Sequence, residues 1–295
     1  MNEIFDKLLI RILFTCFICI ALFLYKYAHT IFYPSKKKQI LKKIYPSENP
    51  VDTLHIFSRL IGVSLIFSTL EFNEYIGVFI SSFHFFVWGI IGFVLYLLSI
   101  WVMESIVLYN FEYKAEVLKK KNMAYGIVSF TLSICLAYII RTIFKEAETS
   151  LVILAILWLF ALVIFGFATK LYKYVSTLPF NSLMIQKNIG LSISYSGFLM
   201  GNTVLLSAAF SHEHHDITSY CIQVILKVLL GALIIPIFRF GIGYIFKINP
   251  THTTEDTDAL HTGQGIYEGA LFLTCAFLAS IIIGQIHFGT IYPFF

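Results

Sequence analysis

The sequence predicts an all-α integral membrane protein, a helical bundle that crosses the bilayer about eight times. Of the 295 residues, 58% are hydrophobic and only 13% are charged, about half the charged fraction of a soluble domain. The hydrophobic residues fall in long runs and not in the short alternating patterns of a soluble sheet. Lysines collect in every second loop, as they do in multi-pass membrane proteins. The chain is therefore expected to be surrounded by the lipid bilayer.

Each apolar run is long enough to cross the bilayer core as a helix, since about 20 residues suffice. Helices are expected because a backbone group without a hydrogen bond is intolerable in lipid, and a helix pairs its own groups. The sequence shows none of the strand-length alternation of polar and apolar residues that is typical of a membrane β-barrel. We place four spans in a first membrane half, residues 1–145, and four in a second half, residues 146–295. The spans lie near residues 8–24, 54–70, 76–109, 123–144, 151–169, 189–210, 219–246 and 265–288.

The loops set the orientation. The loops after spans two, four and six hold a single lysine, Lys145, beside several acidic residues. The loops after spans one, three, five and seven hold Lys26, Lys36, Lys37, Lys38, Lys42, Lys43, Lys114, Lys119, Lys120, Lys121, Lys170, Lys173, Lys187 and Lys247. Because basic loops stay in the cytoplasm, we expect these loops inside and both termini outside.

A short motif repeats at the cytoplasmic start of the outgoing helices. Asn122 and Asn188 each follow a lysine, and small residues occupy the second and fourth positions after each asparagine. His261 takes the asparagine position in a third copy, and a weaker copy begins around residues 49–53. We interpret the chain as four parallel hairpin repeats. The asparagines would cap their helices and the small residues would allow close helix packing; alternatively, the capped ends line a cytoplasmic vestibule.

These residues also carry a family resemblance. The pattern Asn188-x-Gly190-x-Ser192, then Ser196-Gly197, and a second copy over residues 261–269, resembles the bacterial inner-membrane YjfL-like family, known as domain of unknown function 350. The likeness is clearest over residues 151–290. Residues 50–145 look like a more diverged copy, which implies a tandem duplication. The resemblance implies a multi-pass protein of the bacterial inner membrane and carries no catalytic residues.

Four charged residues are predicted inside the spans, at similar depth on the cytoplasmic side. Charges at such positions are costly, so they are either paired or functional. Two acids and two bases at one level can form a structural ion-pair layer that fixes helix register, and arginines can also snorkel to the interface. The alternative is a selectivity or proton-relay layer in a permeation path. The four residues are Arg59, Glu104, Arg239 and Glu268.

Two further polar groups of residues lie towards the outside. Asn202 and Lys227 sit on helices joined by a short loop, so they are expected to form an outer polar pair. The external loop before the second of these helices holds weak candidate ligands for a metal such as zinc, nickel or copper. A solvated, mildly pH-sensitive loop is the simpler interpretation of that cluster. The candidate ligands are His212, His214, His215 and Asp216.

These features favour a channel or transporter for a small ion or solute. The alternative is a non-transporting membrane module that docks a soluble partner on its basic cytoplasmic loops. A metal-dependent enzyme would depend on the external histidines. The sequence contains no phosphate-binding glycine loop, nucleophile elbow, paired-histidine zinc helix or haem-attachment motif. We therefore expect no enzymatic activity, no cofactor and no nucleic-acid partner, and the oligomeric state stays open.

Overall fold

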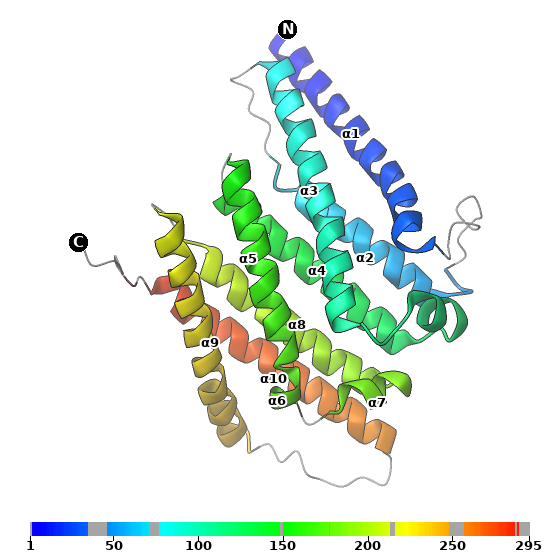
Figure 1. Cartoon of the computed structure of the whole chain (residues 1–295), viewed down its shortest axis with the longest axis vertical. Coiled ribbons are helices and arrows are strands. Elements are labelled where there is room, and N and C mark those ends of the chain that lie inside the picture. Colours follow the sequence, from blue (N-terminus) through cyan, green and yellow to red (C-terminus); the bar gives the residue numbers. More distant parts are fainter. Residues whose placement is uncertain are drawn as a thin grey trace.

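The computed structural model describes residues 2–34, 46–70, 77–147, 150–176, 178–212, 216–247, 257–286 and 288. These residues are mainly helical and include no strand. The long helices are α1 (Asn2–Phe32), α2 (Pro50–Phe67), α3 (Val78–Val107), α4 (Met123–Glu146), α5 (Leu151–Lys170), α8 (Ile189–Phe210), α9 (Ile217–Ile245) and α10 (Thr257–Gln285) (Figure 1). Three short helices lie in the connections: the π-helix η3 (Lys114–Lys119), α6 (Tyr172–Val175) and α7 (Phe180–Ile185).

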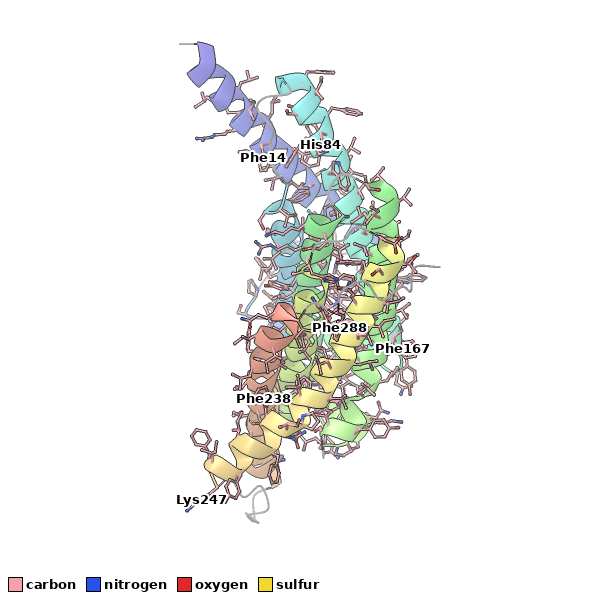
Figure 2. All side chains as sticks on the ribbon, turned by 90° about the vertical axis from the view of Figure 1, so that its left-hand side faces the viewer. Phe14, His84, Phe167, Phe238, Lys247 and Phe288 are labelled. Carbon is pink, nitrogen blue, oxygen red and sulfur yellow. The ribbon has the colours of Figure 1, made fainter. Side chains whose placement is uncertain are left out.

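Within these residues, 8 helices are long and apolar enough to cross a membrane, and each overlaps a predicted span. Their outward side chains are large and apolar. Phe167 of α5, for example, is 72% exposed and points away from the bundle (Figure 2). Such a surface is suited to lipid, so the chain is a multi-pass membrane protein. The lysine run at residues 36–43 lies outside the described residues.

The long helices form two layers. In one layer α2, α4, α8 and α10 pack each against the next, and α8 and α10 make the most extensive contact. In the other layer α1, α3 and α5 pack side by side, while α9 covers α8 and α10 (Figure 1). Helices α4 and α8 are the most buried and α1 and α9 the least. The division into four hairpin repeats stays a prediction.

The contact between α8 and α10 depends on glycines. A Cβ atom added to Gly265 would lie 1.9 Å from the carbonyl oxygen of Gly190. One added to Gly197 would lie 2.3 Å from the carbonyl oxygen of Gly269. The two backbones therefore touch where glycine leaves room for them, which is how helices associate when lipid offers no hydrophobic contrast.

Asparagine is the N-cap of α2, α4 and α8. Its side-chain oxygen accepts a hydrogen bond from the backbone N–H three residues later, which satisfies a donor left free by the helix start. The three pairs are Asn49 with Asp52 (3.2 Å), Asn122 with Tyr125 (3.4 Å) and Asn188 with Leu191 (3.0 Å).

The turns before α4 and α8 are alike and are joined to each other. Lys121 and Lys187, just before the two caps, both have a left-handed backbone, with φ of 48° and 60°. The ammonium group of Lys187 donates to the carbonyl of Lys120 (2.7 Å), and that of Lys121 donates to the carbonyl of Glu48 (2.6 Å). The starts of α2, α4 and α8 are thus tied together. We call this the lysine-rich end of the bundle.

The third copy of the capping motif differs from its prediction. Helix α10 begins at Thr257, so His261 lies inside the helix and is not its N-cap. A residue within a helix has its backbone N–H and C=O engaged in the helical ladder and cannot serve as the boundary residue. Helix α10 therefore extends four residues further towards its N-terminus than the predicted cap at His261.

Candidate functional site: two buried polar clusters

The N-terminal half holds a buried ion pair. Arg59 of α2 is only 2% exposed and bonds through Nη2 to Glu104 of α3. Glu104 also accepts hydrogen bonds from Tyr33 and, at 2.8 Å, from Ser129 of α4. Nη2 of Arg59 lies 3.0 Å from the Ser129 hydroxyl. Both charges are therefore bonded within the protein, as a buried pair requires.

Aromatic and histidine rings surround this pair, and sequence analysis missed them. The rings of Tyr33 and His55 are 4.8 Å apart, those of His55 and Tyr113 are 4.7 Å apart, and His29 lies 5.6 Å from His55. His55 is fully buried, and neither ring nitrogen has a hydrogen-bond partner among the residues that the structure describes, although Nε2 is 3.8 Å from Glu104. With Arg59, Glu104 and Ser129, these residues form the N-terminal cluster.

A sequence signal for this cluster exists. Tyr25, His29 and Tyr33 are spaced by four residues on one helical face, and His55 and Arg59 share a face of the next helix. Tyr113 lies outside the membrane spans and donates to Asp52 (2.6 Å). Burial, followed by the neighbouring Asp52 carboxylate, raises the pKa of Tyr113. Its hydroxyl therefore stays protonated and remains a donor at neutral pH.

The C-terminal half holds a second cluster, built on Glu268 of α10. Glu268 is 5% exposed, and its Oε2 accepts from Ser176 and from Ser194 of α8 (3.1 Å). Oε1 accepts from Gln264 (2.8 Å), one turn earlier on α10. Tyr172 of α6 donates to Ser194 (2.8 Å). These five residues form the C-terminal cluster, in which hydroxyl and amide donors converge on one buried carboxylate.

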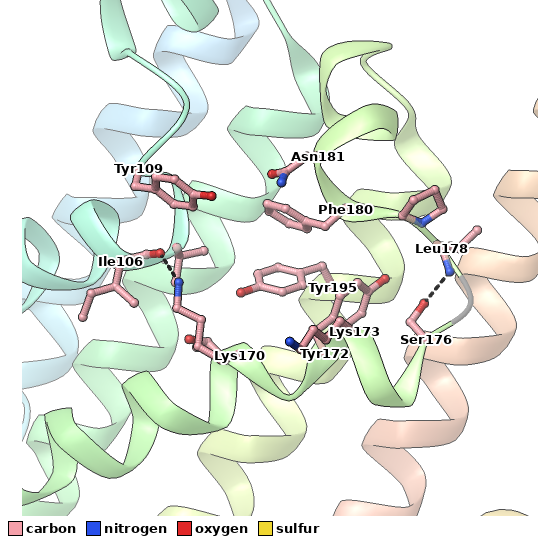
Figure 3. Close-up of a pocket in the computed structure, with 13 residues that line it drawn as sticks. Ile106, Tyr109, Lys170, Tyr172, Lys173, Ser176, Leu178, Phe180, Asn181 and Tyr195 are labelled. Atoms are coloured by element: carbon pink, nitrogen blue, oxygen red, sulfur yellow. Dashed lines mark hydrogen bonds between the residues drawn. The ribbon is translucent and has the colours of Figure 1, made fainter.

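A pocket of about 380 Å³ opens beside the C-terminal cluster. It lies between the ends of α3 and α5 and the short helices α6 and α7 (Figure 3). Tyr172 and Ser176 belong to its wall. Lys170 is also in the wall, where its ammonium group donates to the carbonyl of Ile106 (2.9 Å). We call this space the lysine pocket.

A comparison with protein-family models identifies the family. The model of the family described as Domain of Unknown Function (DUF350) matches residues 3–144 and again residues 147–283. The chain belongs to this family. It is a tandem duplication of the DUF350 unit, as the sequence predicted. No curated protein and no solved structure matches the chain.

Some residues of the two polar clusters occupy corresponding positions in the two DUF350 units. Tyr33 and Tyr172 are as many residues apart as the caps Asn49 and Asn188. By the same spacing, Ser129 of the first unit corresponds to Glu268 of the second. The acid therefore comes from α3 in one unit and from α10 in the other, although a tyrosine and a serine hydroxyl accompany it in both.

The four predicted charge-layer residues divide between the two DUF350 units. Arg59 and Glu104 meet in the first. Glu268 is the centre of the C-terminal cluster, and Arg239 of α9 donates to the carbonyl of Val175 (2.7 Å) at the end of α6. Helix packing thus pairs Arg59 with Glu104, while Glu268 and Arg239 bond to other groups; their common depth in the membrane stays a prediction.

The predicted outer pair does not form a hydrogen bond. Asn202 donates to the carbonyl of Phe198 in its own helix (2.9 Å). Lys227 is fully buried, and its Nζ has no hydrogen-bond partner in the described part of the chain. Their helices α8 and α9 are in contact, but the side chains of Asn202 and Lys227 do not bond to each other.

The external candidate ligands are only partly described. His212 contacts the carbonyl of Ala209 through Nδ1 (2.9 Å) and stacks on Tyr220, with ring centroids 4.4 Å apart. Asp216 is the N-cap of α9 and accepts from Ser219 (2.8 Å). His214 and His215 lie outside the described residues. Among the residues that are described, no group of three or more His, Cys, Asp or Glu could hold a metal ion.

Proposed function

We propose that this DUF350 protein is a channel or transporter that moves a small ion or solute across a bacterial inner membrane, through its C-terminal unit. One observation carries the proposal: the buried Glu268 lies directly behind the wall of the lysine pocket. Ser176 belongs to that wall and donates to Glu268. Tyr172, also in the wall, reaches the same carboxylate through Ser194. A carboxylate inside the membrane that is reached from an open pocket is suited to binding an ion or a proton.

The N-terminal cluster supports a different role. Arg59, Tyr33 and Ser129 all bond to Glu104, so the acid is satisfied within the protein. A pair held this way fixes the positions of α2, α3 and α4 relative to one another. We assign helix register to the N-terminal cluster and the binding of an ion or proton during transport to Glu268.

Flux through liposomes tests the proposal. The purified full chain is reconstituted and flux is measured for protons, sodium, potassium, chloride, inorganic phosphate and small organic phosphates and carboxylates. We expect protein-dependent flux of at least one of these, lowered about tenfold or more by Glu268→Gln because the intramembrane charge is lost. Glu112→Gln, which changes an exposed acid in the loop after α3, is the matched control and should leave flux unchanged.

A folded, inserted protein with no flux across this panel would overturn the proposal. That result would favour the alternative, a module that docks a soluble partner on the lysine-rich end. The supporting observation is that Lys114, Lys119, Lys120 and Lys121 are all exposed there. Copurification from native membranes tests the alternative: replacing these lysines by glutamine should release the partner without affecting insertion.

A further inference from the structure

The lysine pocket has the size of a ligand site. Its volume of about 380 Å³ lies within the range of small-molecule pockets, roughly 300–1,000 Å³. Residues from α3, α5, α6, α7 and α8 form its wall, so it is a feature of the tertiary fold and not of one loop. A space of this size fits an organic molecule better than a bare ion.

The charge of the pocket wall has one sign. Of the 13 described residues that line it, none is acidic, and two are lysines, Lys170 and Lys173. The Lys170 ammonium is held by the carbonyl of Ile106 and lies 5.4 Å from the centre of the Tyr109 ring. A lysine has three N–H donors, so this anchoring leaves donors for a ligand. Two cations in a recess without acids attract anions.

The rest of the wall is aromatic and polar. Figure 3 shows Tyr109, Phe180 and Tyr195 around the same space, with Lys170 and Lys173 on the side of α5 and α6. Asn181 adds an amide that can donate to an oxygen anion. Rings of this kind offer flat apolar contact, which complements an anion with an aromatic or other planar body.

From this wall we infer that the lysine pocket binds a small organic anion carrying a phosphate or carboxylate group, and that this is the class of solute moved by the protein. The inference rests on the proposed function. The negative charge of Glu268 lies behind Ser176 and outside the pocket wall. The anion therefore meets the lysines first, and Glu268 offers a place for a compensating proton or cation.

Binding of phenyl phosphate tests the inference without measuring transport. The full chain is placed in nanodiscs of neutral phosphatidylcholine and titrated calorimetrically. We expect saturable binding that weakens about tenfold in Lys170→Gln and in Lys173→Gln, because each removes one charged hydrogen bond. Lys114→Gln is the control, because it removes an exposed lysine that does not line the pocket. This variant should bind phenyl phosphate as tightly as the unaltered protein does. Inorganic phosphate should bind more weakly, since it lacks the ring.

Three results would overturn the inference. The first is that Lys170→Gln and Lys173→Gln both bind phenyl phosphate as tightly as the unaltered protein does. The second is binding of the cation phenyltrimethylammonium as tightly as phenyl phosphate. The third is loss of phenyl phosphate binding when nanodiscs contain anionic phosphatidylglycerol, which would assign the pocket to a lipid headgroup and not to a solute. Binding without flux would reject only the proposed transport, and flux dependent on Glu268 without binding would reject only the anion site.

Discussion

Three buried ionisable side chains of this protein, Arg59, Glu268 and Lys227, have different hydrogen-bonding surroundings. Arg59 meets Glu104 and the Ser129 hydroxyl. Glu268 accepts from hydroxyl and amide groups beside an open pocket. Lys227 has no hydrogen-bond partner for Nζ among the described residues. A buried charge is costly unless bonded. The bonds of Arg59 and Glu268 meet this requirement, whereas the described residues offer none to Lys227.

Arg59→Met tests the structural role of the ion pair. It leaves the Glu104 carboxylate buried without its cation, which should lower the free energy of unfolding by about 3–5 kcal/mol. The double variant Arg59→Met/Glu104→Leu should recover most of that loss, because no uncompensated charge remains. Denaturant unfolding in detergent measures both. Arg141→Met, at a half-buried arginine of α4, is the control and should change stability little. A double variant as unstable as the single one would contradict the pairing.

At the scale of elements, close backbone contact holds the C-terminal unit together. Helices α8 and α10 meet through Gly190, Gly197, Gly265 and Gly269, where the distances leave no space for a Cβ atom. The same two helices carry Ser194 and Glu268, which are in hydrogen-bond contact. The glycine crossing therefore sets the geometry of the C-terminal cluster as well as the stability of the unit.

Gly265→Ala should separate these helices. The added Cβ would meet backbone that cannot rotate away, so we expect a loss of about 2 kcal/mol or more in unfolding free energy. We also expect weaker Glu268-dependent flux. Gly263→Ala, two residues earlier in α10, meets nothing within 4 Å and should be neutral or stabilising by up to about 1 kcal/mol. Equal stability of the two variants would show that α8 and α10 do not cross this closely.

At the scale of the whole molecule, the lysine-rich end is the feature from which we predict the orientation of the bundle. The starts of α2, α4 and α8 are joined by Lys121 and Lys187, and the lysine pocket opens near the ends of α3 and α5. Cytoplasmic retention of lysines predicts that all these features face the cytoplasm. The solute would then enter the pocket from the cytoplasmic side.

Reporter fusions test this orientation. Alkaline phosphatase requires disulfides and so becomes active only outside the cytoplasm. Fused after residue 212, between α8 and α9, it should be active, and fused after residue 120, before α4, it should be inactive. A green fluorescent protein at the same two positions should give the opposite pattern. Activity at residue 120 would reverse the predicted orientation and move the lysine pocket to the outer face.

The sequence by itself determined the properties that depend on neighbouring residues. A span is recognised by the length of its apolar run, because a lipid-exposed backbone must satisfy its own hydrogen bonds. The caps Asn122 and Asn188 are similarly local, since the side chain bonds three residues ahead. The repeated glycines and serines also carried the family resemblance, and with it the tandem duplication.

Only the tertiary structure decided which polar residues meet. Lipid-facing helices are apolar nearly all round, so periodicity does not say which face turns inward or which helix it meets. Of the predicted charge-layer residues, Arg59 thus meets Glu104 and Glu268 meets serines, and Asn202 and Lys227 form no hydrogen bond with each other. His55 and the lysine pocket required helices distant in sequence to converge. Those contacts depend on helix rotation and packing, which local sequence does not encode.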